Sequence, residues 1–150
     1  CQEELDFANQ RKSLTWFGPE ISKRLFEGET WKDITEEIIR SLPEKIYVSF
    51  DIDGLDPTYC PSTGTPVPGG LSFDQVTYFL ETLAKSDKTL VGFDLCEVSP
   101  SRDGFQWDEN VGSRILYKLC GLLLRSRNRP QKNCPRGQFF GNLYTAITKH

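Results

Sequence analysis

The sequence of 150 residues lacks methionine and has a single histidine, His150, at its last position. A Ser-His-Asp triad needs an imidazole beside its nucleophile, so we expect no catalysis of that kind. A phosphate-binding loop is also missing, because Gly69-Gly70 is followed by leucine rather than by Lys-Ser/Thr. The longest apolar run, residues 119–124, is too short to cross a bilayer.

Cysteine usage excludes two further classes of protein. The five cysteines lie at positions 1, 60, 96, 120 and 134, and no two of them have the C-x-x-C spacing. An odd number without paired spacing is not typical of a disulfide framework or a structural zinc site. Because no secretory signal is visible either, we expect a reduced, cytoplasmic chain with no part in a membrane.

Acidic residues are absent from the last part of the chain. All 21 Asp and Glu precede residue 110, whereas residues 111–150 contain only basic charges. Such a basic tail, which we place at 126–150, is typical of nucleic-acid binding or of packing against an acidic neighbour. No known nucleic-acid-binding module accompanies it, so we favour the second alternative.

The chain begins at Cys1 in a polar stretch that does not open a clear helix or strand. With no initiator methionine, we expect a piece of a longer polypeptide; a processed but complete protein is the alternative. A charged fraction of 26% and a hydrophobic fraction of 37% indicate a globular chain. We expect residues 1–150 to form a single, partial domain.

Helix and strand patterns alternate along the chain. Apolar residues recur at helical spacing after Thr30, after the Ser72/Gln75 capping box and after Asp108, which we expect to be an N-cap. We expect helices at 19–26, 31–42, 73–83 and 109–122, strands at 45–50 and 89–96, and a Gly- and Pro-rich loop at 57–71. This order predicts an α/β fold whose buried parallel strands have helices on both faces.

The first strand pattern ends in Asp51 and Asp53. Residues two apart on a strand share a face, so we expect the two carboxylates to converge at the end of the strand, where ligands of parallel sheets gather. Hard oxygen donors suit Mn²⁺ or Mg²⁺. The alternative is that both aspartates cap turns. Asp56, directly before Pro57, is expected to initiate a turn.

The second strand pattern ends at Glu97, which we expect to be buried and therefore paired. Its partner is a metal, a cationic substrate group such as a guanidinium, or, in the structural alternative, Arg102 or Arg114. The sequence Thr63-Gly64-Thr65-Pro66 places hydroxyls and free backbone groups near the aspartates.

Three ordered motifs together resemble the arginase/agmatinase (ureohydrolase) family. They are Ser49-Phe50-Asp51-Ile52-Asp53-Gly54-Leu55-Asp56-Pro57, Thr63-Gly64-Thr65-Pro66-Val67-Pro68-Gly69-Gly70-Leu71 and Gly92-Phe93-Asp94-Leu95-Cys96-Glu97-Val98-Ser99-Pro100. The resemblance covers residues 43–121. It implies a three-layer α/β/α fold with a parallel sheet, which these residues form incompletely, and a trimer or hexamer.

The same resemblance implies a chemistry and a role for each site residue. Asp51 would bridge two manganese ions, Asp53 would bind one, Glu97 would pair with the substrate's guanidinium, and Thr65 would line the substrate pocket. The reaction would be hydrolysis of a guanidino compound of the agmatine or arginine type, with release of urea.

The remaining metal ligands of this family, a His and an Asp-x-His-x-Asp motif, come from earlier in the polypeptide and are missing here. We therefore expect the C-terminal part of a ureohydrolase, completed by an N-terminal half, and assign no catalytic residue within this chain. We expect it to be inactive by itself. The alternative is a non-catalytic interaction domain of arginase-like fold that has lost its metal site.

Overall fold

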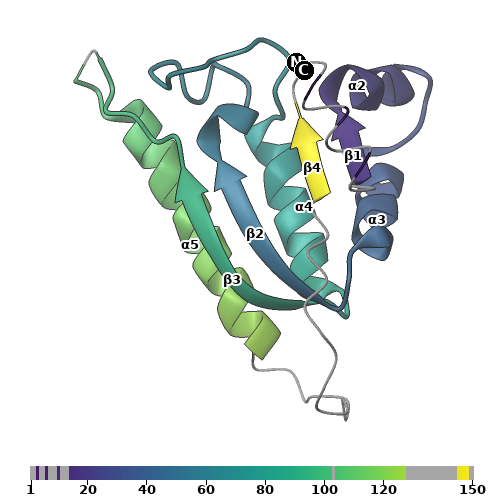
Figure 1. Ribbon diagram of the computed structural model, residues 1–150. Helices are drawn as coiled ribbons and strands as arrows, with labels where there is room; N and C mark the ends of the chain where they lie inside the picture. Colours follow the sequence, from purple (N-terminus) through teal and green to yellow (C-terminus); the bar gives the residue numbers. More distant parts are fainter. Residues whose placement is uncertain are drawn as a thin grey trace.

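The computed structural model describes residues 14–102, 104–127 and 145–148, together with Glu3, Asp6 and Gln10. Most of the expected basic tail lies outside these residues. In chain order the elements are β1 (Leu14–Phe17), α2 (Gly18–Phe26), α3 (Trp31–Ser41), β2 (Lys45–Asp51), the 3₁₀ turn η1 (Ile52–Gly54), α4 (Phe73–Lys85), β3 (Thr89–Cys96), α5 (Trp107–Arg127) and β4 (Thr145–Thr148) (Figure 1).

Strands β2 and β3 form a parallel two-stranded sheet, as the alternating pattern predicted. Their arrows end at the same edge of the sheet, beneath the loops that follow them (Figure 1). The register pairs Asp51 with Cys96, so both chains leave the sheet side by side. This pairing brings the two acidic strand ends together.

Helices cover only one face of this sheet within the described residues. On β2, Ile46, Val48 and Phe50 face the core that α4 and α5 complete, while the alternating residues Lys45 and Tyr47 are exposed. The expectation of a fully buried strand is therefore wrong for this chain. The reason is that no described helix packs against the second face.

Local sequence signals account for the helix starts. Thr30 and Asp33 form a capping box before α3, and Ser72 and Gln75 form one before α4, each satisfying free backbone N–H groups. The N-cap expected at Asp108 is wrong, because α5 begins at Trp107 and includes Asp108 in its first turn. The apolar side of α5 packs its residues Val111, Ile115, Leu119 and Leu122 into the core.

A second, smaller cluster joins α2 and α3 to the rest. Ile21, Ile34 and Ile38 are buried there, with Trp16 of β1 packed against them. Strand β1, for which residues 14–17 gave no clear pattern, pairs in parallel with β4. Strand β4 lies far away in the sequence, so this pairing has no local signal.

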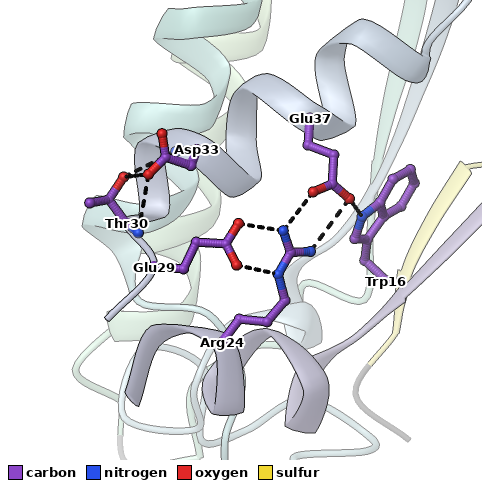
Figure 2. Close-up of polar contacts among 6 residues, drawn as sticks. All are labelled: Trp16, Arg24, Glu29, Thr30, Asp33 and Glu37. Carbon is purple, nitrogen blue, oxygen red and sulfur yellow. Dashed lines mark hydrogen bonds and ion pairs between the residues drawn. The ribbon is translucent and has the colours of Figure 1, made fainter. Parts of the chain in front are cut away.

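An ion-pair cluster holds these elements together (Figure 2). The Arg24 guanidinium donates to both carboxylate oxygens of Glu29, at 2.7 and 2.5 Å, and to Glu37 at 2.5 Å. The indole Nε1 of Trp16 donates to the same Glu37 at 3.1 Å. These charge-assisted bonds hold the pKa of Glu29 and of Glu37 below the usual range, with Arg24 as the main cause.

Across the described residues, no helix combines the length and the apolar composition that crossing a membrane requires.

Candidate functional site

The candidate site lies where β2 and β3 end. Asp51 is the last residue of β2 and is exposed, and Glu97 directly follows its register partner Cys96. Asp53 is not on the strand, because the chain turns into η1 after Asp51. The expectation that both carboxylates lie on one face of the strand is therefore wrong. The turn instead buries Asp53, which is only 8% exposed, beneath the loop that follows.

Thr65 contacts Asp53 directly. Its hydroxyl donates a hydrogen bond of 2.5 Å to Oδ2 of Asp53, across a sequence separation of 12 residues. A short hydrogen bond from a hydroxyl fixes the orientation of the carboxylate that accepts it. The loop residue and the turn residue that the sequence singled out thus form one unit. Asp51, by contrast, makes no hydrogen bond that would cap the turn.

Glu97 is exposed and has a left-handed backbone, with φ of 63°. Within the described residues it forms no ion pair with Arg102 or Arg114. The expected burial of Glu97 and its structural salt bridge are therefore wrong for these residues. Its carboxylate points toward the loop instead: a Cβ added to Gly64 would lie 3.9 Å from Oε2 of Glu97. Glu97 and the Thr65–Asp53 pair therefore flank the same stretch of loop.

The loop 57–71 is closed at its base. Leu55 and Leu71 form an isolated parallel bridge, in which Asp56 N–H donates to Leu71 at 2.9 Å and Leu71 N–H donates to Gly54 at 3.0 Å. Gly70 is required for this approach, since a Cβ there would lie 2.4 Å from the Leu55 backbone. Asp56 initiates the turn as expected, accepting a 3.0 Å bond from Thr58 N–H.

Hydrogen bonds to buried groups hold the middle of the loop in place. The buried thiol of Cys60 donates to the carbonyl of Ile52 at 3.3 Å. The amide N–H of Ser62 donates to Oδ1 of Asp108 at 2.8 Å. Sequence reasoning missed this second contact because it treated Asp108 only as a helix cap. A carboxylate at the start of an apolar helix was the available signal, but its partner lies 46 residues away.

The uncovered face of the sheet carries a polar cluster at the same end. Asp94 accepts a 2.8 Å bond from the Ser49 hydroxyl and a longer one, 3.4 Å, from the Cys96 thiol. The Ser49 bond is the main reason that the pKa of Asp94 is below its usual range. The same carboxylate raises the pKa of the Cys96 thiol, so this cysteine is a poorer nucleophile than a free thiol.

Among the described residues, the carboxylates of the candidate site are donors of the kind that suits manganese. Asp51 and Asp53 offer hard carboxylate oxygens. In the stretches of chain that the structure describes, no group of three or more His, Cys, Asp or Glu side chains is arranged to hold an ion.

Comparison with known proteins places this arrangement in a family. The model of the arginase family matches residues 3–121. An N(1)-aminopropylagmatine ureohydrolase of Thermus thermophilus is 42% identical over 87 residues, which are 58% of this chain and 29% of that protein. An agmatinase of Pyrococcus horikoshii is 36% identical over 124 residues, which are 83% of this chain and 40% of that protein.

A solved structure agrees with the sequence matches. Proclavaminate amidino hydrolase of Streptomyces clavuligerus has a TM-score of 0.62 at 31% identity, over 73% of this chain and 34% of its own. The chain thus spans less than half the length of the relatives that it matches. The fold of the described residues is part of an arginase-type α/β fold with a parallel sheet, and the chain belongs to the arginase family.

Proposed function

We propose that this chain is the C-terminal part of a binuclear-manganese ureohydrolase that hydrolyses a guanidino compound of the agmatine or arginine type and releases urea. The observation that carries the proposal is the joint placement of Thr65, Asp53 and Glu97 at two adjacent parallel strand ends. The printed names of the relatives, agmatinase and N(1)-aminopropylagmatine ureohydrolase, support the class of substrate.

Each site residue has a role in this proposal. Asp51 and Asp53 are the metal ligands, and the Thr65 hydroxyl orients the buried carboxylate of Asp53 through its 2.5 Å bond. Glu97 is the guanidinium partner, because an exposed carboxylate can accept two parallel N–H bonds from that planar cation. Thr65, beside Gly64, lines the substrate side of the loop.

Manganese, when bound, supplies a nucleophile by lowering the pKa of water. The chain's own contribution is to orient the substrate. Glu97 fixes the guanidinium plane, and the closed loop limits where the reacting carbon lies. Because the ligand set is partial, we propose that the 150-residue chain alone is inactive and that the N-terminal half of the fold completes the site.

Three further properties belong to the proposal. Residues 1–150 form one partial domain, with a basic tail at 126–150 that packs on an acidic neighbour. The complete protein is cytoplasmic, and it assembles as a trimer or hexamer. The uncovered face of the sheet supports the need for a further layer.

Urea release tests the proposal. The chain, with Mn²⁺ and agmatine or arginine, is compared with the same chain completed by an N-terminal arginase-family segment that contains the Asp-x-His-x-Asp motif. We expect urea only from the completed protein, and we expect the Asp53→Asn variant to abolish it. Ordinary turnover by the isolated chain would refute the partial-site proposal, and no turnover by the completed protein would refute the enzyme.

The alternative is a non-catalytic interaction domain of arginase-like fold. The exposed stripe of Leu116, Tyr117 and Leu124 on α5, followed by a basic tail, favours it. Manganese binding separates the two functions: tight Mn²⁺ binding by the completed protein supports the enzyme, and its absence supports the interaction domain.

A further inference from the structure

The position of Thr65 depends on what holds the loop just before it. Ser62 and Thr63 are buried, with exposed fractions of 9% and 1%, whereas Gly64 and Thr65 emerge at the surface. The buried residues Ser62 and Thr63 therefore anchor the exposed residues Gly64 and Thr65, which lie beside Glu97 and Asp53. Any group that fixes the backbone of Ser62 and Thr63 also fixes the position of the Thr65 hydroxyl.

Asp108 is that group. Its side chain is buried, with 1% of the residue exposed, and its Oδ1 accepts the Ser62 N–H at 2.8 Å. A buried carboxylate in the first turn of α5 is costly unless it is hydrogen-bonded. Packing alone would be served by an apolar residue, so the buried carboxylate is explained by its bond to Ser62 of the loop and by a longer one, 3.4 Å, from the Ser101 hydroxyl to its Oδ2.

The first turn of α5 also contacts the segment that follows Glu97. Ser101 Oγ accepts the backbone N–H of Asp108 at 3.1 Å and donates to Glu109 at 2.6 Å. The N–H of Arg102 donates to the hydroxyl of Ser62 at 3.3 Å. The start of α5 thus ties together the two segments that carry Thr65 and Glu97, which lie on either side of the site.

We propose that Asp108 is a positioning residue of the site: its bond to Ser62 holds the loop where the Thr65 hydroxyl reaches Asp53. It acts through the loop and touches neither substrate nor metal. Its importance for hydrolysis rests on the proposed function, but the positioning itself is a property of this chain. It can therefore be measured without turnover.

The test compares Asp108→Ala with Asp108→Asn in the full 150-residue chain. Alanine removes the acceptor, whereas asparagine keeps an oxygen in the place of Oδ1. Asp74→Ala is the matched control, because Asp74 is also an acidic residue in the first turn of a helix but is exposed. Should Asp108→Ala fail to fold, Asp108→Ser replaces it, because serine is suited to helix starts but is too short to reach Ser62.

Two NMR measurements report on the loop. Three-bond couplings to the Thr65 methyl show whether its χ1 angle is fixed in one rotamer or averaged. Amide exchange shows whether the Ser62 N–H is bonded. In Asp108→Ala we expect averaged couplings at Thr65 and at least about tenfold faster exchange at Ser62, the factor for losing a bond to a charged group. Asp108→Asn and Asp74→Ala keep the fixed rotamer.

A residue that only stabilised the fold would lower the melting temperature and leave Thr65 in one rotamer. That result for Asp108→Ala, or averaged couplings at Thr65 already in the unsubstituted chain, would overturn the proposal. Urea assays of the completed protein stay separate. A completed protein without turnover counts against the proposed function alone, because the couplings and the exchange rate do not depend on catalysis.

Discussion

The Thr65 hydroxyl lies 2.5 Å from Oδ2 of Asp53 and donates a hydrogen bond to it. This bond joins the surface of the Gly- and Pro-rich loop to the buried turn that follows β2. Hydrogen bonds between a hydroxyl and a carboxylate are short and stronger than bonds between neutral groups. The pair therefore gives the exposed end of the loop a defined place above the strand ends.

Replacing Thr65 by valine keeps the shape of the side chain and removes the donor. In the completed enzyme we expect the KM for agmatine to rise about tenfold, because the bond that holds this end of the loop and Asp53 in place at the substrate is lost, and a bond to a charged group is worth about this factor. Thr65→Ser retains the hydroxyl and should stay close to the original KM. Steady-state kinetics of both variants check this, and equal KM values for the two would contradict the role of the hydroxyl.

Substitution of Glu97 by glutamine tests recognition of the guanidinium. Glutamine keeps the size of the side chain but loses the charge that pairs with a cation. We expect a KM for agmatine that is about 10- to 100-fold higher in the completed enzyme, the range for a charged hydrogen-bonded pair. Glu44→Gln, an exposed glutamate before β2, is the control. An unchanged KM in Glu97→Gln would assign the guanidinium to another partner.

Gly70 and Gly64 form a matched pair within one loop. A Cβ at Gly70 would lie 2.4 Å from the Leu55 backbone, whereas a Cβ at Gly64 would meet its nearest atom at 3.9 Å. We expect Gly70→Ala to destabilise the chain by about 1–3 kcal/mol, as forced overpacking does. Gly64→Ala should change stability by less than about 1 kcal/mol. Urea denaturation measures both, and similar losses for the two variants would contradict a close approach at Gly70.

The cluster of Arg24, Glu29 and Glu37 predicts how stability varies with pH. Arg24 lowers the pKa of both carboxyls, mainly through hydrogen bonds to them. Carboxyls whose pKa is lower in the folded state stabilise it above their unfolded pKa, which is about 4.3 for glutamate. That contribution is lost as the pH falls through the lower folded values.

Arg24→Met removes the cation and keeps most of the apolar stem. We expect a lower urea midpoint at neutral pH and a smaller loss of stability between about pH 5 and pH 3, since both glutamates return toward their usual pKa. Arg24→Lys restores the charge without the planar fork and should recover only part of the difference. If stability falls with pH to the same extent in the original chain and in Arg24→Met, the cluster is not the source of this pH dependence.

Much of the fold follows from local sequence. The helix starts after Thr30 and at the Ser72/Gln75 capping box were predicted correctly, because each capping side chain and the backbone that it caps are only three residues apart. The strands 45–50 and 89–96 were predicted to within one residue of β2 and β3. Their connection through a helix predicted parallel strands, and so the meeting of their two ends.

The placement of the candidate residues was predicted in outline and corrected in detail. The sequence singled out Thr65, Asp53 and Glu97, and the structure brings them to one end of the sheet. It also removes Asp53 from the strand face, since the 3₁₀ turn rotates that side chain into the interior. The periodicity of a strand cannot show where the strand stops.

By itself, then, the sequence determined the helices, the parallel strands and the family motifs, because these depend on residues close together in the chain. Only the tertiary structure decided the burial of Asp53, the pairing of β1 with β4 and the anchoring of Ser62 by Asp108. Each of these depends on atoms from distant segments, whose meeting is set by how the core packs.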